Sequence, residues 1–157
     1  MLLRVNVAQK RTVLASGAFD ILHPGHIRFL EEAKRLGGKN SSLIVVVARD
    51  RTVKENKGRA TIFSEKARLA MVRALKPVDK AVLGYTPFSF EKVIKKYRPD
   101  IVVFGYDQKW LMKRFKELCR RKKWNIKVKV LKKYNLGGLN SSSDVIKKIW
   151  ALKTRAR

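Results

Sequence analysis

The chain has 157 residues, 45% of them hydrophobic, a length and composition that favour one globular domain and exclude a disordered chain. Its 38 Lys and Arg residues against 12 Asp and Glu give a formal net charge of +26, which attracts anionic ligands such as nucleotides and nucleic acids. No apolar run approaches the roughly 18 residues of a transmembrane helix. The apolar stretch within residues 1–11 is too short for a secretory signal, so we expect a cytoplasmic protein without membrane attachment.

Five short apolar runs predict β-strands, and segments with helical spacing lie between them. The strands are expected at residues 13–15, 43–48, 80–83, 101–104 and 126–131. Strands that alternate with helices predict right-handed crossovers and a parallel sheet covered on both faces. We therefore expect an α/β fold with a doubly wound, five-stranded parallel sheet. It would form a single domain over residues 1–157, with a core at about 11–152 and a basic tail at 153–157.

The expected helices carry apolar stripes at intervals of three and four residues. Residues 25–36 form the first helix, and Ser64 is a natural N-cap for the next. The stripes are Ile27, Leu30 and Ala33; Ala67, Ala70, Met71 and Ala74; Phe90, Val93, Ile94 and Tyr97; Leu111, Phe115 and Leu118; and Val145, Ile146, Ile149 and Leu152. The single cysteine, Cys119, excludes an internal disulfide, and its place beside the fourth stripe predicts a buried structural thiol.

Both histidines of the chain fall within one ten-residue block, 17–26, directly after the first expected strand. Gly17 lets a ligand approach the backbone closely, and Pro24-Gly25 opens a helix whose first N–H groups have no intrahelical partner. These free donors, the helix dipole and the two imidazoles together predict a polyphosphate site. Asp20 is expected to be structural, with its carboxylate holding the turn by accepting backbone N–H bonds.

The block Gly17-x-Phe19-Asp20-x-x-His23-x-Gly25-His26 resembles the His-x-Gly-His motif of the nucleotidyltransferase superfamily, in its cytidylyltransferase-like branch. The resemblance covers residues from about 11 to about 150. Within this range, four short sequence segments resemble the archaeal FAD synthase subgroup: residues 47–54, 57–59, 74–80 and 105–108. The resemblance implies a Rossmann-like fold and transfer of AMP from ATP to FMN, with release of pyrophosphate. It also implies Mg²⁺ bound through the phosphates rather than by a dedicated protein cage.

The resemblance also implies which residues form the site. His23 and His26 would be catalytic, holding the α- and β-phosphate oxygens, while Asp107 would read the nucleotide. The expected nucleotide and phosphate ligands are Gly17, Ala18, Phe19, His23, Pro24, Gly25, His26, Asp107, Ser141, Ser142 and Ser143. Weaker candidates are Lys57 and Arg59 on the loop after the second strand, Arg68 on the following helix, and Tyr134 as a stacking partner for the base.

The chain departs from the family pattern at the second phosphate motif. Relatives often carry a basic residue five positions after the first serine of that turn, where this chain has Ile146. The next residue, Lys147, is the candidate to replace that basic residue. A plain N-cap is the alternative role for the three serines.

Two other functions are left open by the sequence. One keeps the fold and the chemistry but uses CTP with glycerol 3-phosphate or a similar alcohol phosphate, because a carboxylate at Asp107 can accept from the exocyclic amine of adenine or cytosine. The other is a basic nucleic-acid-binding protein on a transferase fold, which would have no use for the intact histidine motif. Relatives of this type are commonly dimers, and the oligomeric state is left open.

Overall fold

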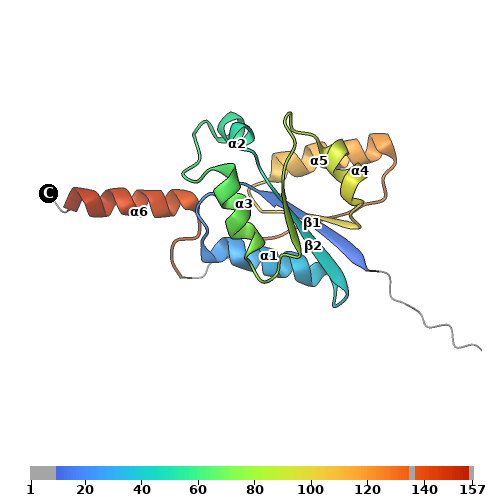
Figure 1. Cartoon of the computed structure of the whole chain (residues 1–157), viewed down its shortest axis with the longest axis horizontal. Coiled ribbons are helices and arrows are strands. Elements are labelled where there is room, and N and C mark those ends of the chain that lie inside the picture. Colours follow the sequence, from blue (N-terminus) through green and yellow to red (C-terminus); the bar gives the residue numbers. More distant parts are fainter. Residues whose placement is uncertain (1–9, 135–136, 156–157) are drawn as a thin grey trace, which may run out of the picture.

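A computed structural model describes residues 10–134 and 137–155 of the chain. Five parallel strands form one sheet in the order β3-β2-β1-β4-β5 (Figure 1). The strands are β1 (Arg11–Gly17), β2 (Ser41–Val47), β3 (Lys80–Leu83), β4 (Ile101–Phe104) and β5 (Lys127–Val130). The helices are α1 (Pro24–Gly37), α2 (Asp50–Lys57), α3 (Glu65–Arg73), α4 (Phe90–Tyr97), α5 (Lys109–Lys122) and α6 (Ser142–Arg155). The predicted fold class and all five predicted strands are confirmed.

Two separate clusters of buried side chains lie on the two faces of the sheet, because successive residues of a strand point to opposite faces. Val13 of β1 packs in one cluster with side chains of α1 and α3, whereas the next residue, Leu14, packs in the other with side chains of α4 and α5. Figure 1 shows these two pairs of helices on opposite sides of the strands. Cys119 of α5 is only 9% exposed and belongs to the second cluster, which confirms the predicted buried thiol.

The sequence did not predict α2, and it assigned the wrong buried face to α3. Only Val53 of α2 is buried, so this polar helix has no stripe that periodicity could detect. In α3 the buried side chains are Arg68 and Val72, while Ala70 and Ala74 of the expected stripe are exposed. The error arose because a buried arginine does not count as apolar in a periodicity argument.

Helix α6 carries the last predicted apolar stripe, but no residue of this helix belongs to either core cluster of the described residues. Ile149 is 59% exposed and Leu152 is 57% exposed, and α6 extends away from the sheet in Figure 1. Residues 153–155 of the expected basic tail continue α6, and 156–157 lie outside the described residues. None of the described helices combines the length and the apolarity that crossing a bilayer requires.

Candidate phosphate-binding site

A cavity of about 920 Å³ lies at the carboxyl edge of the sheet, where the predicted motifs meet. Its walls come from the segments that follow all five strands, together with the turn before α6. The β1–β2 register ends with Gly17 opposite Val47, so the chain segments after these strands begin at the same level. Ligands of open parallel sheets bind at this edge, because the loops after neighbouring strands diverge there.

The two histidines lie face to face in the wall of this cavity. His23 is the N-cap of α1, and the His26 N–H donates to the His23 carbonyl oxygen at 2.9 Å. Their rings stack with centroids 3.8 Å apart and planes inclined by 28°. Phe19 supports this pair, because its buried ring lies 5.2 Å from that of His26. Its φ of 50° is in the left-handed region, which a bulky residue adopts only where the surrounding structure holds it.

Both imidazoles are neutral near pH 7. Burial, followed by the proximity of His23 and Lys57, lowers the pKa of His26 from 6.5 to about 3. Burial also lowers the pKa of His23, against the opposing effect of Asp144. The Nδ1 atoms of both rings are buried without a hydrogen-bond partner among the residues that the structure describes. Buried polar atoms of this kind carry a free-energy cost in the ligand-free chain.

The turn before α6 brings the three predicted serines to the start of α1. A Cβ atom on Gly25 would lie 3.0 Å from the His23 ring and 3.4 Å from the Asn140 backbone oxygen, so glycine permits this close approach. Ser141 caps α6 by accepting the Asp144 N–H at 3.1 Å. The cavity is therefore lined by the N-termini of two helices, whose free N–H groups suit phosphate oxygens. The residues of this part of the wall are Asn140, Ser141, Ser142 and Ser143.

Asp20 holds two distant segments together rather than its own turn. Its side chain is 3% exposed and accepts the backbone N–H groups of Ile62 and Phe63 at 2.8 and 3.0 Å. Arg59 forms an ion pair with the same carboxylate at 3.3 Å and also lines the cavity. The predicted structural role of Asp20 is confirmed, but its partners are about 40 residues away. Lys57 lines the cavity from the last residue of α2, not from the loop that the sequence predicted.

Arg68 does not line the cavity, although the sequence placed it among the phosphate ligands. Its side chain is fully buried, and its guanidinium donates to the backbone oxygens of Ala18, Ala48 and Phe63. It also pairs with Asp50 at 2.7 Å. Arg68 therefore fixes the segments after β1 and β2, and its donors face protein acceptors instead of a ligand.

Helices α2 and α3 cap each other beside Arg68. The Asp50 carboxylate accepts the Glu65 N–H at 3.1 Å, and the Glu65 carboxylate accepts the Asp50 N–H at 3.0 Å. Although burial acts in the opposite direction, the Arg68 hydrogen bond holds the pKa of Asp50 below its usual value. Arg49 joins this network through Glu65 at 2.6 Å and the Gly84 backbone oxygen at 2.8 Å, which ties the end of β3 to α2 and α3.

The segment after β4 contributes the predicted nucleotide reader and an unpredicted tie between strands. Asp107 is exposed and lines the cavity, as does Tyr134 after β5. The Gln108 side chain accepts the Gly105 N–H at 2.8 Å and donates to the Ser16 backbone oxygen at 3.0 Å, which joins the ends of β4 and β1. Sequence reasoning did not assign this role to Gln108, because its partner lies 92 residues away.

Several cavity-lining residues were not singled out from the sequence. Lys132 lies two residues after the end of β5 and could have been found from the rule that ligands bind beyond the carboxyl ends of strands. The aromatic and basic side chains on the α4–α5 side have no such motif; they are Tyr85, Phe88, Trp110 and Arg114. Within the described residues, no group of three or more His, Cys, Asp or Glu side chains is placed to hold a metal ion.

Known proteins match this chain over nearly all the segments that form the cavity. The cytidylyltransferase-like family matches residues 14–149. A protein named FAD synthase from Methanothermobacter marburgensis is 48% identical over 141 residues, which cover 90% of this chain and 86% of that protein. A protein named FAD synthase from Aciduliprofundum boonei is 49% identical over 137 residues, which cover 87% of this chain and 89% of that protein. A crystal structure described as the lipopolysaccharide core biosynthesis protein of Thermoplasma volcanium has a TM-score of 0.72 and 41% identity, covering 80% of this chain and 98% of that one.

Proposed function

We propose that this chain, which belongs to the cytidylyltransferase-like family, is an FAD synthase that transfers the adenylyl group of ATP to FMN. A phosphate oxygen of FMN attacks the α-phosphorus of ATP, and the bond from that phosphorus to the pyrophosphate oxygen breaks. The products are FAD and pyrophosphate. The observation that carries this proposal is the stacked, neutral pair His23 and His26 in the cavity at the start of α1.

The reaction needs charge stabilisation more than proton transfer, because the attacking phosphate is already an anion. His23 and His26 would donate hydrogen bonds to oxygens of the α- and β-phosphates, where negative charge increases in the transition state. A preorganised donor of this kind lowers the activation barrier by about 3 kcal/mol. The free N–H groups at the start of α1 and Ser141, Ser142 and Ser143 would hold the triphosphate in place for in-line attack.

The remaining predicted ligands divide between the base and the phosphates of the nucleotide. Asp107 would accept from the exocyclic amine of adenine, and Tyr134 would stack on the base. Lys57 and Arg59, which also line the cavity, would neutralise phosphate charge. Lys57 supports this role because its charge already contributes to the lowered pKa of His26.

Mg²⁺ is expected to enter with ATP, coordinated by phosphate oxygens, and to neutralise charge on the leaving pyrophosphate. The Asp144 carboxylate lies near this part of the wall, where its charge opposes the effect of burial on the pKa of His23. That carboxylate would repel the triphosphate unless a cation screens it.

We also propose that the enzyme forms a homodimer in the cytoplasm, where ATP and FMN are available. Ile149, Trp150 and Leu152 of α6 are more than half exposed in the single chain, and a second copy would cover them. Sedimentation equilibrium of the wild type and of Trp150→Lys tests this association. A wild type that sediments as a monomer at micromolar concentration would refute it.

A pyrophosphate-release assay with Mg²⁺ tests the proposed reaction, with ATP and CTP each combined with FMN and glycerol 3-phosphate. Release with ATP and FMN, together with FAD identified by chromatography, is the expected result. Release with CTP and glycerol 3-phosphate would replace FAD synthesis with the cytidylyltransferase alternative. His26→Gln should lower kcat by about 100-fold or more, because it removes a transition-state donor. Unchanged kcat in this variant would refute the role of the histidines.

A further inference from the structure

The cavity extends past the histidines to a wall of aromatic side chains between β3 and α5. Tyr85 and Phe88 follow β3, and Trp110 lies in the first turn of α5. Phe88 is 42% exposed and Trp110 is 47% exposed, although both residues are large and apolar. Aromatic surface exposed inside a cavity that also holds a polar reaction site is typical of ligand binding.

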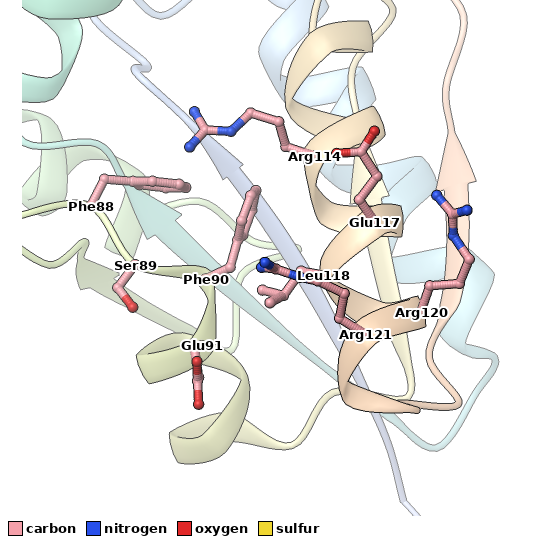
Figure 2. Close-up of a pocket in the computed structure, with 9 residues that line it drawn as sticks. All are labelled: Phe88, Ser89, Phe90, Glu91, Arg114, Glu117, Leu118, Arg120 and Arg121. Atoms are coloured by element: carbon pink, nitrogen blue, oxygen red, sulfur yellow. The ribbon is translucent and has the colours of Figure 1, made fainter.

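Phe88 is held by the protein core before any ligand binds. Its ring packs edge-on against Phe90 with centroids 4.7 Å apart, and Phe90 packs on the fully buried Phe115 at 5.1 Å. Figure 2 shows Phe88 beside Phe90, with the Arg114 side chain reaching from α5 toward Phe88. Phe88 and Arg114 also line a second, open cavity of about 750 Å³, so they form the rim between the two cavities.

Arg114 and Trp110 form the α5 side of this wall. The Arg114 guanidinium lies 5.8 Å from the centroid of the Trp110 ring, one helical turn away. A guanidinium placed against an aromatic ring keeps its edge N–H groups available for carbonyl oxygens. The wall therefore offers flat apolar faces and hydrogen-bond donors together.

In-line displacement decides on which side of the histidines the acceptor binds. The attacking oxygen and the leaving pyrophosphate must lie on opposite sides of the α-phosphorus. The serine turn and the start of α1 occupy one side of the cavity, while Arg49 and Tyr85 line it on the β2–β3 side. An acceptor phosphate on the β2–β3 side would place the rest of FMN toward Phe88.

On the basis of the proposed function, we infer that the isoalloxazine ring of FMN binds between Phe88 and Trp110, with Arg114 donating to its pyrimidine-dione edge. The isoalloxazine is a large planar system with an apolar dimethylbenzene end and a carbonyl-rich opposite end. Aromatic side chains stack on such a ring, and Arg donors match its carbonyl oxygens. Phe88, Trp110 and Arg114 are thus the residues that select a flavin over a small alcohol phosphate.

The test compares Phe88→Leu with the control Phe63→Leu, because Phe63 is 41% exposed but does not line the cavity. FMN binding is measured without ATP by the quenching of flavin fluorescence, and KM is measured separately for FMN and ATP. Because a stacked ring contributes roughly 1–3 kcal/mol, we expect Phe88→Leu to weaken FMN binding about tenfold or more. KM for ATP should change less than twofold. Phe88→Tyr should retain FMN binding within twofold, because it keeps the ring.

Trp110→Leu and Arg114→Met should likewise raise KM for FMN and leave KM for ATP unchanged. A rise confined to KM for ATP would overturn the inference by assigning this wall to the adenine. Unchanged FMN affinity in Phe88→Leu, in an enzyme that still makes FAD, would overturn the inference and leave the proposed function intact. A wild type that binds no FMN and makes no FAD would overturn the proposed function itself.

Discussion

Replacing the buried Arg68 by Met tests whether one side chain fixes the segments that form the phosphate site. The substitution keeps the length and apolar stem of the side chain but removes the guanidinium. It leaves three backbone oxygens without the donor that now satisfies them: those of Ala18, Ala48 and Phe63. Because Ala18 and Ala48 directly follow β1 and β2, their segments lose the bond that joins them to α3.

The expected loss of unfolding free energy is about 3–5 kcal/mol. Each buried acceptor that loses its donor costs roughly 1–3 kcal/mol. Asp50 adds little, because its side chain is 43% exposed and water can replace Arg68. Relief from the burial of the Arg68 charge offsets part of the sum. Since a domain is stable by only about 5–15 kcal/mol, Arg68→Met should be close to unfolding.

Urea unfolding followed by circular dichroism measures this loss. The matched control is Arg73→Met on the same helix, whose side chain is exposed and makes one hydrogen bond at 3.2 Å, to the Ala81 backbone oxygen. We expect the control to lose less than about 1 kcal/mol. Arg68→Lys should be intermediate, because a single ammonium group cannot reach all four acceptors. Equal unfolding midpoints for Arg68→Met and Arg73→Met would refute the reasoning.

Four further predictions follow from the site and the core. MgATP binding at pH 6 should take up protons, because phosphate oxygens raise the lowered pKa values of His23 and His26; equal binding enthalpies in two buffers of different ionisation enthalpy would contradict this. Unfolding free energy should fall as the pH decreases from 6.5 toward 3, by up to about 1.4 kcal/mol per pH unit, since only the unfolded state protonates His26. The unfolding free energy of His26→Gln should depend less steeply on pH, which checks that His26 causes the effect. Gly25→Ala should raise KM for ATP by separating His23 from the turn before α6, whereas an unchanged KM would show that the contact adapts. Burial raises the pKa of the Cys119 thiol, so its reaction with a disulfide reagent should be slow in the folded protein and fast in urea.

Local sequence determined the order of the strands along the chain and the position of the phosphate motif. Apolar runs such as residues 101–104 are short, continuous and bounded by polar segments, so they specify buried strands without reference to distant residues. The motifs at residues 17–26 and 105–108 each follow a strand, and the structure brings both to one edge of the sheet. They meet there because parallel strands end at the same edge of a sheet.

Only the tertiary structure shows which polar side chains join the segments around the cavity and which side chains line the cavity itself. Arg and Gln are residue types that usually lie on the surface. In this chain, however, the hydrogen-bond partners of Arg68 and Gln108 lie up to 50 and 92 residues away in the sequence. No local spacing encodes such contacts. The same holds for the wall at Phe88 and Trp110, because their separation in the chain gives no sign that one cavity brings them together. Periodicity reports which face of an element is apolar, whereas the partner of that face depends on how the whole chain packs.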